Sequence, residues 1–250
     1  MDQPDRRIIN REENNIFGDA NYGKLAIDQN EISRDFVNLK EYIVTPAVNL
    51  TLPYEAGGAN IEIKAGFLGE YKSRNYKNRQ FFYRFNRYGL PSDFVYRYVL
   101  SEILKADNYG TDKLYIYEDT DNRNSYKGEN LNGAGYLSFK LTAGKLNLTA
   151  GLRGETGRMT LTSYDKIYEF TTRSKSYDYF DLYPSVNGSW NISKNELIRV
   201  AYGKSVNRQE FRELSSSVYY DFNLFSDVKG NPELKHATIN NIDLRYEYYP

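Results

Sequence analysis

The feature that most constrains the fold is an alternation of apolar and polar residues with a period of two. Between residues 61 and 72, one set of alternate positions holds Ile61, Ile63, Ala65, Phe67 and Tyr71, and the other holds Glu62, Lys64, Glu70 and Lys72. A β-strand points successive side chains to opposite faces, whereas a helix repeats every 3.6 residues. The alternation therefore predicts two-sided strands and an all-β, antiparallel fold.

The same alternation recurs along most of the chain. It predicts seven strands, at 43–54, 60–74, 133–142, 145–162, 179–192, 196–207 and 237–249. Residues 16–28 alternate poorly and are a weaker candidate for an eighth strand. The predicted strands are longer than the five or six residues typical of globular proteins.

The connections between these strands alternate in length. Short turns lie at 55–59, 143–144 and 193–195, and long polar segments lie at 75–132, 163–178 and 208–236. An up-and-down sheet with short turns on one rim and long loops on the other is typical of outer-membrane barrels. Ten residues rise about 33 Å along a strand, and a tilt of about 45° projects this to about 23 Å, close to the apolar band of such barrels.

Aromatic residues cluster near the ends of this predicted band. The chain has 25 Tyr, 13 Phe and one Trp in 250 residues. Tyr and Trp favour the membrane interface because they combine an apolar body with a polar tip. We predict Tyr54, Trp190 and Tyr248 beside the short-turn rim, and Tyr71, Tyr136 and Tyr164 toward the long-loop rim.

Composition excludes several functional classes. The chain has no Cys and one His, which rules out disulfides and thiolate chemistry and leaves little room for a zinc site. Lys and Arg balance Asp and Glu at 33 each, so the basic surface that nucleic acid requires is missing. Residues 118–124 only partly match a calcium loop, since Arg123 occupies a ligand position and Asn124 replaces glycine. We predict no enzyme activity, no cofactor and no metal site.

A soluble β-sandwich is the alternative interpretation, because its strands also alternate where one face meets a core. Its function would be that of a secreted carbohydrate-binding or adhesion module. Long strands, a polar face that is charged along its length, and the asymmetry of the loops favour the membrane barrel. The two folds differ in the surroundings of five side chains, which would meet a second sheet in a sandwich and form an exposed belt in a barrel: Ile61, Ile63, Phe67, Leu148 and Leu152.

Several segments, in order, resemble TonB-dependent outer-membrane receptors. Residues 136–155 are similar to a receptor hairpin that ends in Gly-Leu-Arg-x-Glu, here Gly151 to Glu155. Residues 182–186 resemble the following strand start. Residues 197–214 resemble a strand that runs into an Arg-Pro-Phe-Arg-Glu-Leu loop, with Gln209-Glu210 where proline is common. Gly230-Asn231-Pro232 and the segment 241–247 complete the match, which covers about 130–250 well and 43–85 more loosely.

This resemblance implies a barrel of about 22 strands around an N-terminal plug, in the outer membrane of a Gram-negative cell. The implied function is import of a scarce nutrient with energy from an inner-membrane TonB-type complex. Iron chelates, cobalamin and oligosaccharides are all compatible substrates. The implied partners are membrane lipid, the rest of the receptor with its plug, the energy-coupling complex and a small-molecule or oligosaccharide substrate.

Residues 1–250 are expected to form part of one barrel domain, about a third of a receptor barrel. No plug or energy-coupling box precedes residue 43, no signal peptide is present, and the chain stops at Tyr249-Pro250 where a receptor would continue. We therefore expect an internal portion of a receptor, an open sheet that forms no stable pore alone. Pro46 lacks a ladder donor and predicts a bulge or an edge.

Two groups of residues are candidates for function. Arg208, Phe211 and Arg212 follow a strand at the predicted outer mouth, where Arg and aromatic groups suit anionic or sugar-like ligands. Salt bridges at the rim are the competing interpretation. The second group holds polar residues predicted to face the barrel interior and to pair with neighbouring strands or the plug: Glu62, Lys64, Arg153, Glu155, Asp243, Arg245 and Glu247.

Overall fold

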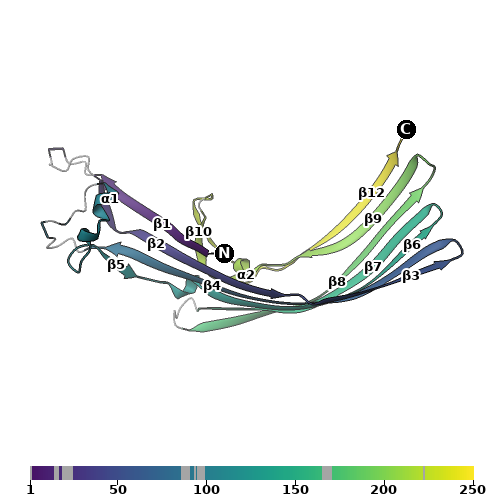
Figure 1. Cartoon of the computed structure of the whole chain (residues 1–250), viewed down its shortest axis with the longest axis horizontal. Coiled ribbons are helices and arrows are strands. Elements are labelled where there is room, and N and C mark those ends of the chain that lie inside the picture. Colours follow the sequence, from purple (N-terminus) through teal and green to yellow (C-terminus); the bar gives the residue numbers. More distant parts are fainter. Residues whose placement is uncertain are drawn as a thin grey trace.

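The chain folds into one long antiparallel sheet that curls into an open trough (Figure 1). The computed structural model describes residues 2–13, 17–18, 25–85, 91–92, 94, 99–164, 171–221 and 223–250, with the side chains of 2–13, 25–31 and 220 left out. Seven strands carry the trough: β3 (Ala47–Ala56), β4 (Ala59–Arg84), β6 (Tyr126–Ala143), β7 (Leu146–Tyr164), β8 (Thr172–Asn191), β9 (Glu196–Asn207) and β12 (Ala237–Tyr248).

These seven strands match the seven predicted from the sequence and pair in chain order. The sheet runs β1-β2-β4-β6-β7-β8-β9-β12, and β3 and β5 (Tyr115–Glu118) also pair with β4. The short turns lie at one end, and two of them use glycine in the left-handed region, with Gly58 at φ 78° and Gly144 at φ 55°. Among the described strands, β12 pairs only with β9, so the sheet is open as expected.

The strands extend further toward the long-loop end than the sequence pattern predicts. β4 continues to Arg84, and β6 begins at Tyr126, so the predicted loop 75–132 shrinks to 85–125. Likewise β8 begins at Thr172, which shortens the predicted loop 163–178. The apolar-polar alternation weakens there, because polar residues such as Ser73, Asn75 and Lys77 take the convex positions of β4. The ends of β9 agree with the prediction.

The N-terminal region departs most from the sequence analysis. In place of one weak strand at 16–28, β1 (Asp2–Glu13) pairs with β2 (Leu25–Val44), while residues 16 and 19–24 lie outside the described part. β2 and β3 lie end to end along β4, and the register passes through Pro46 without a shift. The predicted bulge is therefore wrong, but β3 is an edge strand, and Pro46 still accepts a hydrogen bond from Gly69 at 2.9 Å.

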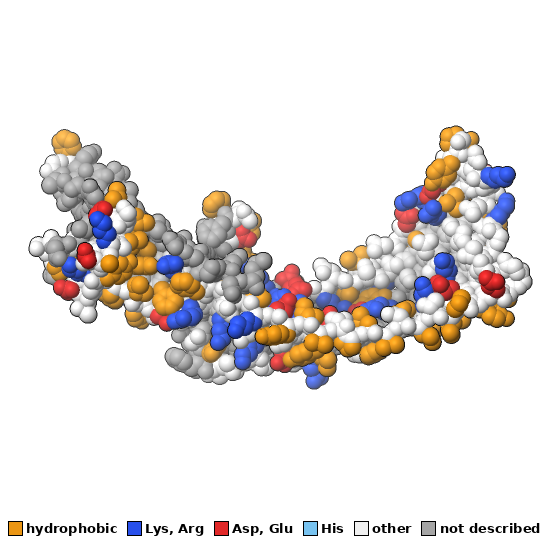
Figure 2. Space-filling model, in the orientation of Figure 1, with side chains coloured by type: hydrophobic (Ala, Val, Ile, Leu, Met, Phe, Trp, Pro, Cys, Tyr) orange, Lys and Arg blue, Asp and Glu red, His pale blue; other side chains and the backbone are white. Residues whose placement is uncertain are grey.

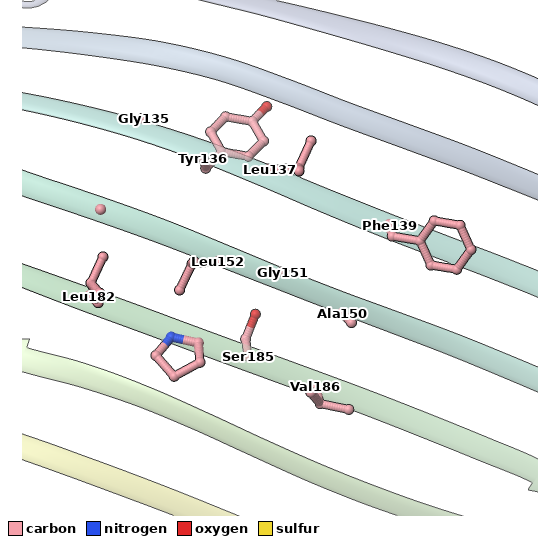
Figure 3. A pocket seen from close by; sticks show the side chains of 12 residues that line it. Gly135, Tyr136, Leu137, Phe139, Ala150, Gly151, Leu152, Leu182, Ser185 and Val186 are labelled. Carbon is pink, nitrogen blue, oxygen red and sulfur yellow. The ribbon is translucent and has the colours of Figure 1, made fainter.

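The convex face of the trough carries an apolar belt. Val48 is 72% exposed, Phe67 60% and Ile242 81%, and the described elements place no second sheet over them. Figure 2 shows this apolar surface along the lower side of the trough. A water-soluble sandwich would bury these side chains, so the sandwich alternative is wrong. In Figure 3, Leu137, Phe139, Leu152 and Val186 surround a shallow depression of about 460 Å³ within the belt, where Gly135 and Ala150 leave room.

Aromatic side chains lie at the ends of this belt at four of the six predicted positions. Tyr164 ends β7 and lies further toward the long loops. Tyr54, Trp190 and Tyr248 are exposed near the short turns, and Tyr71 is exposed toward the long loops. Tyr136 instead points to the opposite face, where its hydroxyl donates to Asn49 Oδ1 at 2.8 Å. Its even position on β6 places it there, between the outward-facing Gly135 and Leu137.

Buried side chains gather in two small clusters near the long loops. One joins the ends of β2 and β4 to the segment that holds α1 (Leu100–Ile103) and η1 (Ala106–Asn108), and its members are Ile32, Tyr83, Phe85, Phe94, Ile103 and Leu114. The other joins α2 (Phe211–Leu214) to β6 and β7: Tyr126, Leu161, Phe211 and Leu214. Helices in the described part of the chain are too short to cross a bilayer.

Candidate functional site on the concave face

The segment that follows β9 turns inward and lies on the concave face of the trough (Figure 1). It contains α2 and is followed by a small separate hairpin of β10 (Val218–Asp221) and β11 (Ser226–Lys229). We call residues 208–217 the strap. The strap brings all three predicted ligand-binding candidates, Arg208, Phe211 and Arg212, onto or beside the polar face of β4, β6, β7 and β8.

Arg208 anchors the start of the strap to two carboxylates. Its Nη1 donates to Glu155 Oε2 at 2.6 Å, and its Nη2 donates to Asp181 Oδ2 at 2.9 Å. Nη2 also bonds the Tyr183 hydroxyl, and the guanidinium lies 4.0 Å from the centroid of the Tyr179 ring. The planar guanidinium can donate to two separate carboxylates at once, a geometry that suits Arg rather than Lys.

Arg208 lies between two carboxylates that face each other on neighbouring strands of the sheet. Glu155 and Asp181 are direct cross-strand partners on β7 and β8. Like charges directly opposite one another destabilise a sheet, and Arg208 offsets that repulsion. Glu155 also accepts from Arg153 Nε at 2.7 Å, and His236 Nε2 lies 3.8 Å from Asp181 Oδ1. Arg208 therefore makes the salt bridges that the competing interpretation predicts.

Phe211 anchors the middle of the strap by burial. Phe211 and Leu214 are each 1% exposed and pack on Tyr126 and Leu161. The Phe211 ring occupies the space where a Cβ at Gly128 would lie, so any side chain at position 128 would collide with it. The role of Gly128 was not visible in the sequence because the contact joins residues far apart in the chain.

Charged groups surround the Phe211 ring. Lys72 Nζ lies 5.7 Å and Arg74 Cζ 5.5 Å from the ring centroid. Both cations also approach Glu210 Oε2, at 3.5 and 3.8 Å. Glu41 of β2 pairs with Lys72 at 3.7 Å and also bonds Arg74. Two cations of β4, one carboxylate of β2 and one of the strap thus balance where the strap meets the sheet.

The Gly230-Asn231-Pro232 motif holds the end of the strap. A Cβ at Gly230 would lie within 2.6 Å of the carbonyl oxygens of Ser215, Arg212 and Glu213, so only glycine fits. Asn231 N donates to Glu213 O at 2.6 Å. The Pro232 carbonyl accepts from Lys175 Nζ at 2.9 Å and from the Tyr177 hydroxyl at 3.0 Å. The motif thus packs the returning chain against α2 and β8.

Arg212 differs from the other two candidates because it is exposed. Its guanidinium carbon lies 3.4 Å from the centroid of the Tyr219 ring on β10, a cation–π contact. A capping box orders α2, the helix that contains Arg212: Glu210 is the N-cap, and the Glu213 carboxylate accepts a hydrogen bond from the Glu210 N–H. Arg212 and Tyr219 therefore present a charged and aromatic surface above the trough.

The predicted interior polar residues alternate with the apolar belt and mostly pair locally. Lys64 lies 3.2 Å from Glu62 on the same strand. Glu247 pairs with Arg199 at 3.2 Å and Arg245 at 3.8 Å. Asp243 is exposed and has no ion pair within the described residues. Among described residues, no three His, Asp or Glu side chains form a group that could hold a metal.

Two solved structures are similar to parts of this chain. The ferric citrate transporter FecA in its unliganded form is 14% identical, with a TM-score of 0.44 over 73% of this chain and 23% of the transporter. The siderophore receptor PiuA from Acinetobacter baumannii is 12% identical, with a TM-score of 0.47 over 90% of this chain and 30% of the receptor. The chain thus spans less than a third of either protein.

Among curated proteins, none matches the sequence significantly. The sequence profile of the outer membrane protein β-barrel family matches residues 10–249, almost the whole chain. The apolar convex belt, the polar concave face and the long antiparallel strands are features of outer-membrane barrels. The chain therefore belongs to the outer membrane protein β-barrel family and resides in the outer membrane.

Proposed function

We propose that this chain forms part of the wall of a TonB-dependent receptor that imports a scarce nutrient across the outer membrane. The observation that carries the proposal is the strap: a loop from the long-loop rim folds back onto the concave face and is anchored there at three points. A loop that narrows the interior of a barrel can control which molecules enter it. The segments that resemble the receptor family support the same proposal.

In this function the two faces of the sheet have different roles. The convex belt contacts lipid, and the concave face contacts the plug and the substrate path. Glu62, Lys64, Asp243, Arg245 and Glu247 would line this path near the short-turn side. Arg208 and Phe211 hold the strap in place, so we assign ligand contact to Arg212 with Tyr219 on the exposed side of the strap.

Arg212 and Tyr219 together suit an anionic or sugar-like substrate. The guanidinium supplies a planar set of donors for carboxylate, phosphate or hydroxyl groups, and the aromatic ring holds it in position. Both iron chelates and acidic oligosaccharides present such groups. The proposed role is transport rather than catalysis, because the contacts of the strap fix a loop instead of arranging an acid, a base and a nucleophile.

Uptake by living cells tests the proposal. Cells that depend on the protein should lose growth on the limiting nutrient when the protein is deleted or when the TonB-type complex is removed. Uptake that persists without the energy-coupling complex would contradict TonB dependence. Arg212→Gln should weaken uptake through a raised substrate concentration at half-maximal rate, and Arg173→Gln, on β8, serves as a matched control.

A further inference from the structure

The outward-facing residues of the convex face change from apolar to polar and basic directly above the apolar belt. Beyond Tyr71, the outward positions of β4 are Ser73, Asn75 and Lys77, and beyond Leu131 those of β6 are Glu129 and Lys127. On β2, which runs antiparallel to β4, Lys40 is the next outward position beyond Tyr42 toward the long loops. Lys40, Lys77 and Lys127 are exposed, and basic side chains gather on the lower surface in Figure 2 where the apolar band ends.

The strand register brings two of these lysines into one row. Asn75 of β4 is the direct partner of Lys40 on β2 and of Lys127 on β6. Adjacent strands lie about 4.8 Å apart, so the two lysines flank Asn75 with their Cα atoms roughly 10 Å apart. This spacing leaves room for an anionic group between them.

A groove opens beside this row where the sheet forks. The β4–β6 pairing ends at Tyr76 and Tyr126, and β4 then pairs with β5. The resulting groove has a volume of about 580 Å³ and is lined by Lys77, Lys127, Arg79, Thr162 and Tyr164 among others.

Some of the basic side chains in and beside the groove have ion-pair partners, and others have none among the described residues. Arg79 bonds Glu118 through two nitrogens at 2.9 Å. In the described part of the chain, no carboxylate lies within 4.0 Å of Lys40, Lys77 or Lys127. The nearest outward acid along β6 is Glu129, one outward position below Lys127. The groove and the adjacent row thus carry a net positive charge.

The lysines lie at increasing heights above the belt, beginning in the headgroup layer. Lys40 is two residues beyond Tyr42, Lys127 four beyond Leu131 and Lys77 six beyond Tyr71, which a 45° tilt converts to about 5, 9 and 14 Å above the belt. The headgroup layer is about 5–7 Å thick on each side, and flexible lysine stems can reach toward it. Hydroxyl pairs continue this polar surface on β7 and β8, with Thr160 and Ser176 3.0 Å apart and Thr162 and Ser174 2.7 Å apart.

We propose that Lys40, Lys77 and Lys127 bind the phosphate group of an anionic lipid in the outer leaflet. The ammonium groups supply charge and donors to the phosphate, Asn75 and Thr162 supply neutral polar groups, and the apolar belt below receives the acyl chains. Free phosphate would lack the contact with the belt. This inference requires only the outer-membrane location and does not depend on the proposed transport.

Lipid binding by the protein, purified from outer membranes in a neutral detergent, tests the inference. The probes are a diphosphorylated lipid A, phosphatidylcholine and inorganic phosphate, titrated with native mass spectrometry. The variant carries Lys77→Gln and Lys127→Gln. The matched control carries Lys64→Gln and Lys140→Gln, on the same two strands but on the concave face. Attraction of about fivefold per basic residue predicts that the first pair weakens lipid A binding roughly thirtyfold.

The control pair should change lipid A affinity less than twofold, and Lys77→Arg with Lys127→Arg should keep it, because the charge stays. Binding should also weaken as salt is raised. Unchanged affinity in the Gln variant, equal loss in the control pair, or inorganic phosphate bound as tightly as lipid A would overturn the inference. Circular dichroism and the heat-dependent mobility of each variant establish that it is folded.

Discussion

Large apolar side chains are exposed in the belt region of the sheet and buried in its long-loop region. In the belt, large apolar groups such as Leu137 are 58% exposed, because lipid replaces water around them. Beyond the belt, Phe85, Ile103 and Phe211 are 1% exposed or less, because loops fold over the strands and exclude water. The difference teaches that the surrounding solvent, rather than the strand pattern, decides where a protein core forms.

The largest effect should come from placing a charge in the belt. Leu137→Arg puts a guanidinium at the middle of the belt, and a cation at the bilayer midplane destabilises barrels by about 2–4 kcal/mol. Ser138→Arg, on the next residue and the opposite face, should have little effect. The measurement is the free energy of unfolding in urea, with the protein in lipid vesicles. Equal losses for the two variants would mean that the belt does not face lipid.

The next effect tests how tightly the strap packs on the concave face. Gly128→Ala would drive a methyl group into the Phe211 ring, and overpacking typically destabilises by about 1–3 kcal/mol. Protease cleavage within 208–236 should become faster. In a Phe211→Ala background the same substitution should cost much less, since the colliding ring is gone. An additive double mutant would show that the two residues are not in contact.

A smaller effect is expected at the anchor of the strap. Arg208→Gln leaves Glu155 and Asp181 facing each other without their shared cation. Because Arg208 retains some solvent exposure, we expect a loss of about 1–2 kcal/mol in unfolding free energy rather than the larger value of a fully buried pair. Adding Asp181→Asn should recover much of this loss by removing the repulsion. No recovery would show that Arg208 acts through another contact.

The smallest effect concerns an ion pair at the tip of the long-loop region. Bonds from Arg79 and Thr120 lower the pKa of Glu118 from 4.5 to about 2. A lowered pKa means that this pair favours the folded state above pH 4.5 and loses its contribution as pH falls toward 2. Carbon-detected NMR of the Glu118 carboxyl should show the midpoint. Arg79→Gln should return it toward 4.5, and an unchanged midpoint would disprove the assigned cause.

The strand pattern predicted the belt region well because lipid and the barrel interior impose different chemistry on the two faces. Seven strands, the two kinds of connection and the open sheet were all predictable, and the ends of β9 were predicted correctly. The pattern failed in the upper part of β4, because polar residues such as Asn75 and Lys77 take its convex positions and loops bury Tyr83 near its end. The N-terminal strand β1 and most of β2 were missed as well, since their sequences show no clear alternation.

The candidate site was only partly predictable. Arg208, Phe211 and Arg212 were found because they follow a strand in a segment that resembles a known family. Their different contacts, with Arg208 on carboxylates, Phe211 buried and Arg212 exposed on Tyr219, depend on how the strap folds back across four strands. Gly128 carries no signal of its own, and the motif around Gly230 signals only a family resemblance, because a close approach becomes visible only when its partner is in place.

By itself, the sequence determined the class of fold, the two faces of the sheet and the membrane as its surroundings. These properties follow from local alternation, which each strand expresses independently of its neighbours. The tertiary structure alone decided the curvature of the sheet, the seat of the strap, the groove where β4 leaves β6, and the pairing of each charge. Those depend on register and on contacts between distant segments, where a shift of one residue would exchange the two faces of a strand.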